Sequence, residues 1–220
     1  TVADAAENPG GRVTRESRLP GLSAWKRVVD YRMGQIEKLD NVQMFQQSEL
    51  DKSQVLEFAR ELDVQHVLCA TGSAWDREGF GRQHNSAIQS DGTVRVITPD
   101  DIMSGETVSG AVTVYDDDHF YMGGVIAEAL VKMGVEVTLV TPAADVSTWT
   151  HNTLEQGYIE KQLHDLGIVI IEKHRLKALE NGEVTIEHIS SGKSRSLETG
   201  NLAMVTARRP QHDLYFELEG

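Results

Sequence analysis

Cysteine is nearly absent from the sequence, which limits the chemistry that the chain can carry. Only one of its 220 residues, Cys69, is a cysteine. A disulfide within the chain, or a zinc or iron–sulfur site built from four of its own cysteines, is therefore excluded. The eight histidines are scattered without the spacing of a metal site. We expect no metal site in this chain and a reducing, cytoplasmic compartment.

Positive charge is also scarce, with 21 Lys and Arg against 34 Asp and Glu and a net charge of −13. An acidic chain repels nucleic acids and anionic membrane surfaces, so we expect neither as a partner. Apolar runs are short, the longest lying near 167–171, whereas about 20 residues are needed to span a bilayer. Residues 1–11 lack the basic and apolar parts of a secretory signal, so we expect none.

What the sequence does contain is an alternation of strand-like and helix-like segments, which is typical of parallel βαβ units. Residues 22–41 carry apolar side chains at helical spacing, and 181–182 is an Asn-Gly hairpin signal. The pattern predicts strands at 2–5, 42–46, 65–72, 93–98, 111–115, 135–141, 168–171 and 202–208, helices at 22–41, 51–63, 122–133 and 152–166, and a meander at 173–199. Two such sets, joined around 100–110, predict two tandem nucleotide-type folds.

The turn after the strand at 111–115 departs from a dinucleotide-binding loop. Such a loop has the pattern G-x-G-x-x-G, but 116-DDDHFYMGG-124 has aspartates where the first two glycines belong. These carboxylates would repel a diphosphate. They also supply the negative charge that is favourable at the N-terminus of a helix. We predict that no NAD(P) binds here; a plain N-capping acidic turn is the alternative interpretation.

The first set has weaker signals of a nucleotide site. Asp4 ends a strand, where an acid accepts hydrogen bonds from a ribose, and Gly10-Gly11 suits close passage of a phosphate. Residues 70–75, ATGSAW, end another strand, and Trp75 is a candidate cover for adenine. The alternatives are a turn aspartate, an ordinary glycine turn and a core tryptophan.

Catalytic constellations are missing from the sequence. No nucleophile elbow is present. His119 lies in an acidic, aromatic turn, where a solvated or capping histidine is the simpler interpretation. Cys69 lies in an apolar segment and is expected to be a buried thiol. We assign no catalytic residue.

Five segments resemble one known family: 10-GGRVTRESRLPGLSAWKRVVDYR-32, 68-LCATGSAW-75, 112-VTVYDDDHFYMGGVIAEAL-130, 136-EVTLVTPAADVSTWT-150 and 204-MVTAR-208. Together they are similar to the C-terminal region of the trimethylamine, dimethylamine and histamine dehydrogenases. These are flavoproteins related to old yellow enzyme and dienoyl-CoA reductase. The PGL–W–DYR and YDDD–YMGG patterns are specific to this group, whereas the GG and ATG patterns are shared by many flavin disulfide reductases.

The resemblance implies an α/β fold with tandem Rossmann-like domains of the glutathione reductase type, the first of them incomplete. It implies an FAD/ADP-binding-like domain at 1–108 that lacks its first strand and G-x-G-x-x-G turn. An NAD(P)-binding-like domain with a degenerate phosphate loop follows at 109–210, and 211–220 begins the return to the first domain. The barrel with FMN and a four-iron–four-sulfur cluster would lie outside this chain.

The resemblance also implies site residues and partners. ADP or FAD would bind at the first domain, where eight residues match the family pattern: Asp4, Gly10, Gly11, Arg12, Ala70, Thr71, Gly72 and Trp75. The whole protein would oxidise a small amine by demethylation or deamination, pass electrons to an electron-transfer flavoprotein and form a homo-oligomer. This segment would be structural and without catalytic residues.

Two other interpretations stay open from the sequence. One is part of an NAD(P)H-dependent flavin oxidoreductase of the dienoyl-CoA reductase type, which requires a working phosphate loop at 116–124. The other is a freestanding interaction module without catalysis. The amine cannot be read from this chain, because its pocket would lie in the barrel.

Overall fold

The computed structural model describes residues 1–219. The chain forms two compact units. Unit 1 contains Thr1–Ala74 and Pro210–Gly220, and unit 2 contains Trp75–Arg209. The chain passes between them through β3 (Ser73–Trp75) and β13 (Arg208–Pro210), which form a two-stranded sheet.

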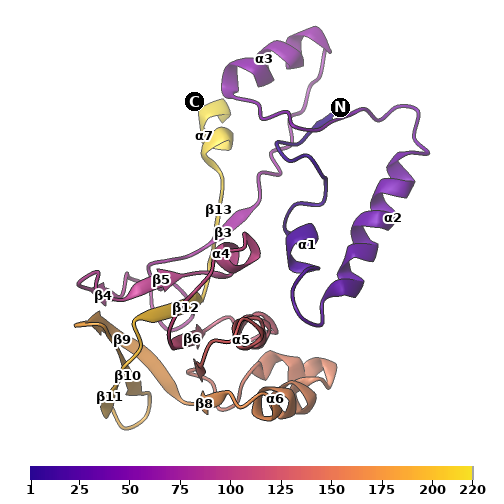
Figure 1. The fold of residues 1–220 in the computed structure, drawn as a ribbon. Coiled ribbons are helices and arrows are strands. Elements are labelled where there is room, and N and C mark those ends of the chain that lie inside the picture. The colour runs from indigo at the N-terminus through magenta and orange to yellow at the C-terminus, as the bar shows by residue number, and fades with distance from the viewer. Residues whose placement is uncertain (220) are drawn as a thin grey trace. The chain divides into compact units, whose positions relative to one another are not determined.

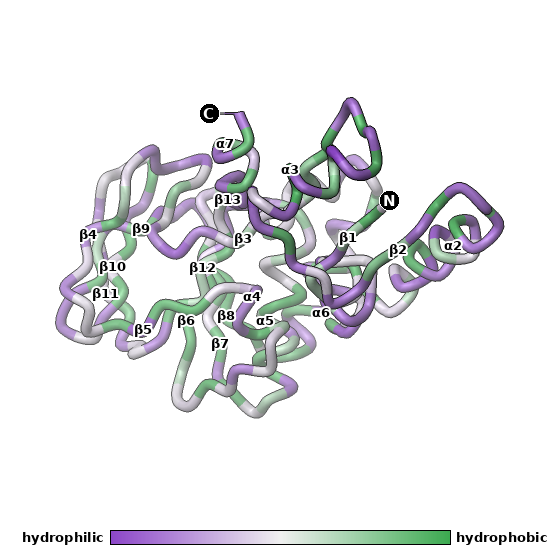
Figure 2. Tube along the Cα trace, turned by 90° about the horizontal axis from the view of Figure 1, so that it is seen from above, coloured by the Kyte–Doolittle hydropathy of each residue, from purple (hydrophilic) through white to green (hydrophobic). Residues whose placement is uncertain are grey.

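Unit 2 is built on a five-stranded parallel sheet with the strand order β5-β12-β6-β7-β8. Its central strands are short apolar runs that are buried along their whole length, as parallel strands covered on both faces require. Figure 2 shows the hydrophobic colour along β6. The strands are β5 (Arg95–Ile97), β6 (Val112–Asp116), β7 (Val137–Val140), β8 (Val169–Ile171) and β12 (Asn201–Val205).

Helices supply the crossovers of this sheet. Helix α5 (Met122–Lys132) contacts β6, β7 and helix α6 (Gln156–Asp165), and it ends before Gly134, whose φ of +84° suits a helix end. The 3-10 helix η2 (Thr148–Thr153) precedes α6, and α4 (Pro99–Met103) begins with a capping box and a proline in its first turn.

An antiparallel meander covers the other face of the parallel sheet (Figure 1). The sheet that contains this meander has the order β11-β10-β9-β4, with β4 paired in parallel to β9, and it joins the five-stranded sheet in one apolar core. Its members are β4 (Gln89–Ser90), β9 (His174–Glu180), β10 (Glu183–His188) and β11 (Ser194–Leu197). Asn181 and Gly182 both have positive φ, as a tight hairpin turn needs, which confirms that signal.

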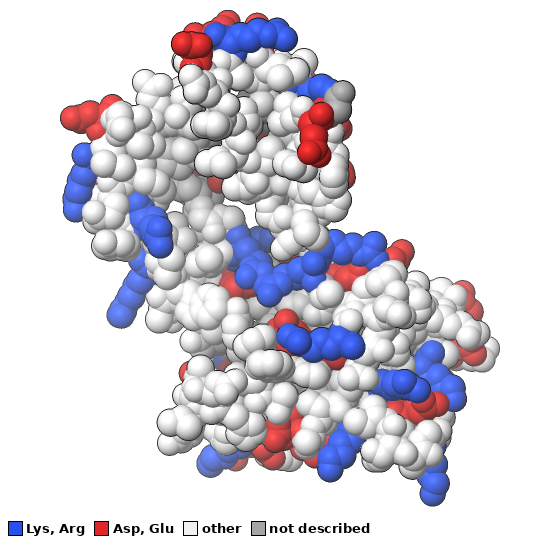
Figure 3. All heavy atoms as spheres, turned by 180° about the vertical axis from the view of Figure 1, so that it is seen from behind, with Lys and Arg blue, Asp and Glu red and all other residues white. Residues whose placement is uncertain are grey.

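The surface of unit 2 carries both signs of charge close together. Arg95 pairs with Glu106 and Arg77 with Asp101. Figure 3 shows basic and acidic side chains interspersed over this unit on the visible face. Such exposed pairs contribute little to stability individually.

Unit 1 has little sheet and much exposed apolar surface. Strand β1 (Val2–Ala3) pairs in parallel with β2 (Met44–Phe45), two residues each. The described part of unit 1 also contains four α-helices, α1 (Gly11–Glu16), α2 (Lys26–Ile36), α3 (Lys52–Glu61) and α7 (Asp213–Glu219). The 3-10 helix η1 (Ser23–Trp25) precedes α2. Helix α3 begins at Asp51, whose side chain completes a capping box with Gln54. No residue of α2 is buried.

The prediction of a buried strand at 65–72 is wrong. This segment is extended chain without strand pairing, and Leu68 is 92% exposed. A strand needs neighbours to bond its backbone, and the described part of unit 1 supplies only β1 and β2, which pair with each other. Cys69, expected to be buried, is half-buried for the same reason.

The compact units also differ from the sequence-based boundary at 108/109. Residues 75–108 belong to unit 2, because β5 pairs with β12 and completes its parallel sheet. The α/β class and the parallel sheet are confirmed. No helix among residues 1–219 is long and apolar enough to cross a membrane.

Asp76 holds together the two chain segments at the border of unit 2. Its side chain is buried, and Oδ1 accepts hydrogen bonds from the backbone N–H groups of Glu78, Gly79 and Phe80 at 2.8, 2.7 and 3.0 Å. Oδ2 accepts a bond from Nε of Arg209, so a buried carboxylate joins the entering segment to the leaving one.

Candidate nucleotide-binding sites

Asp4 lies directly after β1 in unit 1. Its backbone N–H donates to the carbonyl of Phe45 at 2.8 Å, which continues the pairing of β1 with β2. Its Oδ1 accepts a hydrogen bond from the N–H of Ala6 at 2.9 Å. Within residues 1–219, no hydrogen bond to Oδ2 of Asp4 is observed.

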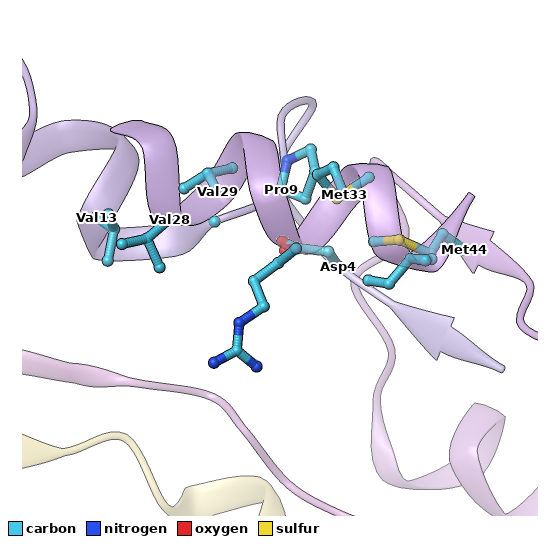
Figure 4. A pocket seen from close by; sticks show the side chains of 10 residues that line it. Asp4, Pro9, Val13, Val28, Val29, Met33 and Met44 are labelled. Atoms are coloured by element: carbon cyan, nitrogen blue, oxygen red, sulfur yellow. The ribbon is translucent and has the colours of Figure 1, made fainter. Parts of the chain in front are cut away.

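Asp4 lines a cavity of about 270 Å³ in unit 1. The volume is slightly below the range of ordinary small-molecule pockets, so it suits a nucleoside rather than a whole dinucleotide. Figure 4 shows the side chains around it. The lining residues are Asp4, Pro9, Gly10, Val13, Val28, Val29, Arg32, Met33, Ile36 and Met44.

Helix α2 gives this cavity its apolar wall. Val28, Val29 and Met33 line it from the helix, and Met44 faces it from β2. The amphipathic stripe predicted at 22–41 is therefore real. Its apolar side is turned to a cavity instead of a packed core, which explains why no residue of α2 is buried. A planar base can be held by such side chains without hydrogen bonds.

Gly10 allows α1 to approach α2. Its φ is +111°, and a Cβ there would lie 2.6 Å from Oγ1 of Thr14 and 2.7 Å from Cγ2 of Val29. Gly10 also lines the cavity. Gly11, with φ +50°, faces open space on its Cβ side and does not line the cavity. Of these two glycines, only Gly10 is required by packing.

Arg12 is engaged elsewhere. Its Nε lies 2.9 Å from Oε1 of Glu16, one helical turn away, and the Glu16 side chain is fully buried. A buried carboxylate needs its cation, so this pair holds the Arg12 guanidinium beside α1. Arg12 is not among the cavity residues.

The remaining predicted residues lie away from the cavity. Ala70, Thr71 and Gly72 are in the extended segment before β3, where the Thr71 hydroxyl donates to the carbonyl of Gln211 and the Gln211 N–H donates to the carbonyl of Gly72 at 2.9 Å. These residues anchor the returning chain. Trp75 is 5% exposed in unit 2, with the guanidinium of Arg208 4.9 Å from its ring centroid. The structure agrees with the interpretation of Trp75 as a core residue.

In unit 2, the side chain of Asp116 bonds to the backbone of the turn that follows it. Asp116 is the last residue of β6 and is fully buried, and its Oδ1 accepts the backbone N–H groups of Asp118 and His119, each at 3.1 Å. In a phosphate-binding turn, N–H groups at this position point toward the ligand. Here the chain's own carboxylate satisfies them.

The pKa of Asp116 is raised to about 7. Burial is the main cause and the negative charge of Asp118 adds to it, whereas the hydrogen bonds from the turn and the charge of His119 lower the pKa. Oδ2 of Asp116 has no hydrogen-bond partner among residues 1–219, so the charged form is poorly compensated.

Asp117 holds a second segment against the same turn. Its buried Oδ2 accepts the N–H of Gln83 at 2.9 Å, and its Oδ1 lies 3.3 Å from Nε2 of His119. A Cβ on Gly81 would come within 2.4 Å of Oδ2, so the backbone of this segment packs directly on the carboxylate. The carboxyl end of β6 is thus covered by protein. His119 is part of this buried structure, not a solvated side chain.

Sequence reasoning missed Arg32 and Met44 as cavity residues and Asp76 and Asp117 as anchors. Arg32 has helical spacing to Val28 and Val29, so the sequence places it on the same side of the helix. Nothing in the sequence marks Asp76, because its partner Arg209 is 133 residues away. No group of three or more His, Cys, Asp or Glu among residues 1–219 is arranged to hold a metal ion.

A covered parallel sheet with a self-capped strand-end turn defines unit 2 as an α/β domain of the βαβ type. The family described as the OYE-like second alpha/beta domain matches residues 97–212, more than half of the chain. The chain belongs to this family.

Three of its relatives are named as enzymes that act on amines. Histamine dehydrogenase from Rhizobium sp. 4-9 is 44% identical with a TM-score of 0.95, over 99% of this chain and 33% of that one. The 6-hydroxypseudooxynicotine amine oxidase from Pseudomonas geniculata N1 is 38% identical with a TM-score of 0.93, over 99% and 32%. Dimethylamine dehydrogenase from Hyphomicrobium sp. (strain x) is 27% identical over 99% of this chain and 32% of its own length. The chain spans about a third of the length of each.

We predict that NADH and NADPH do not bind at the 116–124 turn, because the Asp116 carboxylate fills it. Titration calorimetry tests this, with saturating ADP present so that an adenosine cavity elsewhere is already filled. No heat of binding is expected. Micromolar binding that vanished on changing Asp116 or Asp117 would show that the turn accepts a dinucleotide after all.

Proposed function

We propose that this chain is the C-terminal, nucleotide-binding-like portion of an amine-oxidising iron–sulfur flavoprotein. The observation that carries the proposal is the 44% identity and TM-score of 0.95 to histamine dehydrogenase across nearly the whole chain. In this proposal the two units are tandem Rossmann-like domains of the FAD- and NAD(P)-binding kind. The oxidation would take place in other parts of the polypeptide, which would carry FMN and a four-iron–four-sulfur cluster. We assign no catalytic residue to this chain.

The surface of unit 1 supports a place within a longer polypeptide. A parallel sheet of two short strands is too small to be stable alone. Unit 1 also leaves many large apolar side chains exposed, which normally marks a surface that is covered in the complete protein. They are Val2, Val28, Tyr31, Leu39, Phe45, Phe58, Leu62, Val64, Val67, Leu68, Tyr215 and Phe216.

Unit 1 would bind the adenosine part of ADP or FAD in the cavity beside Asp4. Asp4 follows a parallel strand, the place where an acid accepts hydrogen bonds from a ribose. Asp4 lines a mostly apolar cavity of about 270 Å³. Gly10 provides close approach of the backbone, whereas phosphate contacts by Gly11 or Arg12 stay a prediction of the sequence pattern.

Unit 2 would be a structural domain that has lost its dinucleotide. The carboxylate of Asp116 on the turn N–H groups supports this. Electrons would then leave the protein for a protein acceptor, which we propose to be an electron-transfer flavoprotein. A dienoyl-CoA-reductase-like enzyme would need NAD(P)H at this same turn.

The experiment that tests the whole proposal is the mass and absorbance spectrum of the full-length protein. We expect a subunit of about three times 24.4 kDa, a flavin band and a broad iron–sulfur shoulder, and a homo-oligomer in light scattering. A colourless protein of the mass of this chain would mean a freestanding module. Reduction of the flavin by NADPH, without an amine, would favour the reductase.

Asp4→Asn tests the nucleotide site. Asparagine keeps an oxygen for the N–H of Ala6 but cannot accept two ribose hydroxyls as a carboxylate does. ADP affinity in the full-length protein should fall about 10- to 100-fold, the worth of a charge-assisted hydrogen bond. Glu7→Gln is the matched control, because Glu7 is exposed and outside the cavity. Equal affinity of Asp4→Asn and wild type would remove Asp4 from the site.

A further inference from the structure

The cavity of unit 1 contains two charged side chains of opposite sign. Among its ten lining residues only Asp4 and Arg32 carry a charge. They do not form an ion pair with each other; no hydrogen bond or ion pair joins Arg32 to any residue within 1–219. Arg32 therefore brings an exposed, uncompensated guanidinium to the wall of an otherwise apolar cavity.

The sequence pattern assigned phosphate to a different arginine. Arg12 follows Gly10-Gly11, but its guanidinium is bonded to the buried Glu16 carboxylate, 2.9 Å away. Moving Arg12 to a ligand would leave that carboxylate buried with a weakened partner, which is costly. Arg32 breaks no hydrogen bond or ion pair with residues 1–219 when it binds an anion.

The two charges of the cavity match two neighbouring parts of a nucleoside phosphate, the ribose and the phosphate. A carboxylate accepts hydrogen bonds from the ribose hydroxyls, and a guanidinium donates two parallel bonds to phosphate oxygens. The apolar lining side chains suit the base. A nucleoside alone would use Asp4 and the apolar wall and would leave Arg32 without a partner.

We propose that Arg32 is the phosphate-binding residue of this cavity and that it makes the site select adenine nucleotides over adenosine. The inference rests on the proposed function, since it assumes that the cavity takes an adenine nucleotide. Arg32 belongs to helix α2 and lies outside the glycine turn. In this proposal it distinguishes a nucleotide from its nucleoside.

The test is calorimetric titration of the full-length protein, dialysed free of bound nucleotide, with ADP, AMP and adenosine. For Arg32→Ala we expect ADP and AMP affinities to fall about 10- to 100-fold while adenosine affinity changes less than about twofold. Arg32→Lys keeps the charge without the bidentate geometry and should fall between. Arg27→Ala is the matched control: Arg27 is exposed on the same helix and outside the cavity, so all three ligands should bind as in wild type.

Two results would overturn the assignment while leaving the nucleotide site in place. One is unchanged ADP affinity in Arg32→Ala. The other is an equal loss for ADP and adenosine, which would mean that Arg32 stacks on the base. A wild-type protein that binds neither ADP nor adenosine would overturn the proposed function of unit 1 itself, and Arg32 with it.

Discussion

Gly123→Ala is expected to destabilise unit 2 by about 3 kcal/mol, the upper range for overpacking a filled core. A Cβ at this position would lie 2.4 Å from Cγ and 2.6 Å from Cβ of Asp116. Asp116 cannot move aside, because it is fully buried and accepts two backbone N–H groups of the turn. Urea denaturation at pH 7 measures the change in the free energy of unfolding.

The neighbouring glycine is the control for this prediction. Gly124 lies on the same helix, and its Cβ would meet nothing nearer than Cγ2 of Ile159 at 3.4 Å. Gly124→Ala should be neutral or stabilising by up to about 1 kcal/mol, because alanine favours a helix. Two variants of equal stability would mean that Asp116 does not fill the space beneath Gly123.

Asp116→Asn is expected to remove a large pH dependence of stability. A carboxyl whose pKa is raised from 3.8 to about 7 on folding keeps its proton longer in the folded state than in the unfolded state. Between pH 4 and pH 7 the folded state therefore binds more protons, and stability falls as pH rises. A pKa shift of this size corresponds to about 4 kcal/mol of stability, which is present below pH 4 and lost above pH 7.

The measurement compares wild type and Asp116→Asn by urea denaturation at pH 4.5 and pH 8. Relative to wild type, the variant should be more stable at pH 8 than at pH 4.5 by several kcal/mol. Asp165→Asn, an exposed acid of α6, controls for the removal of one negative charge. An unchanged difference between Asp116→Asn and wild type at the two pH values would show that Asp116 is ionised throughout.

The elements of unit 2 could be predicted because each carries its own periodic signal. The run 112-VTVY-115, the apolar stripe of α5 and the Asn181-Gly182 turn all specify their structure locally. Residues 65–72 carry a similar apolar signal and yet form no strand. An apolar run becomes a strand only where partners bond its backbone, and that depends on residues distant in the sequence.

Asp4 and Gly10, which the sequence pattern places close together, line the same cavity, and their contact with a nucleotide stays a prediction. Arg12 shows the opposite case, because the i,i+4 spacing to Glu16 was a visible signal of an ion pair. Whether Trp75 covers a ligand or fills a core depends on Arg208, more than 130 residues later, so its burial could not be predicted.

The paired crossing of β3 and β13 also bears on how this protein arose. Unit 2 begins at Trp75 and ends at Arg209, and Asp76 and Arg209 bond to each other at its border. A domain whose entrance and exit are adjacent can be gained, exchanged or removed as one cassette without threading the host chain differently. Substitutions inside unit 2 can therefore accumulate while the entry and exit of the chain at Asp76 and Arg209 stay unchanged.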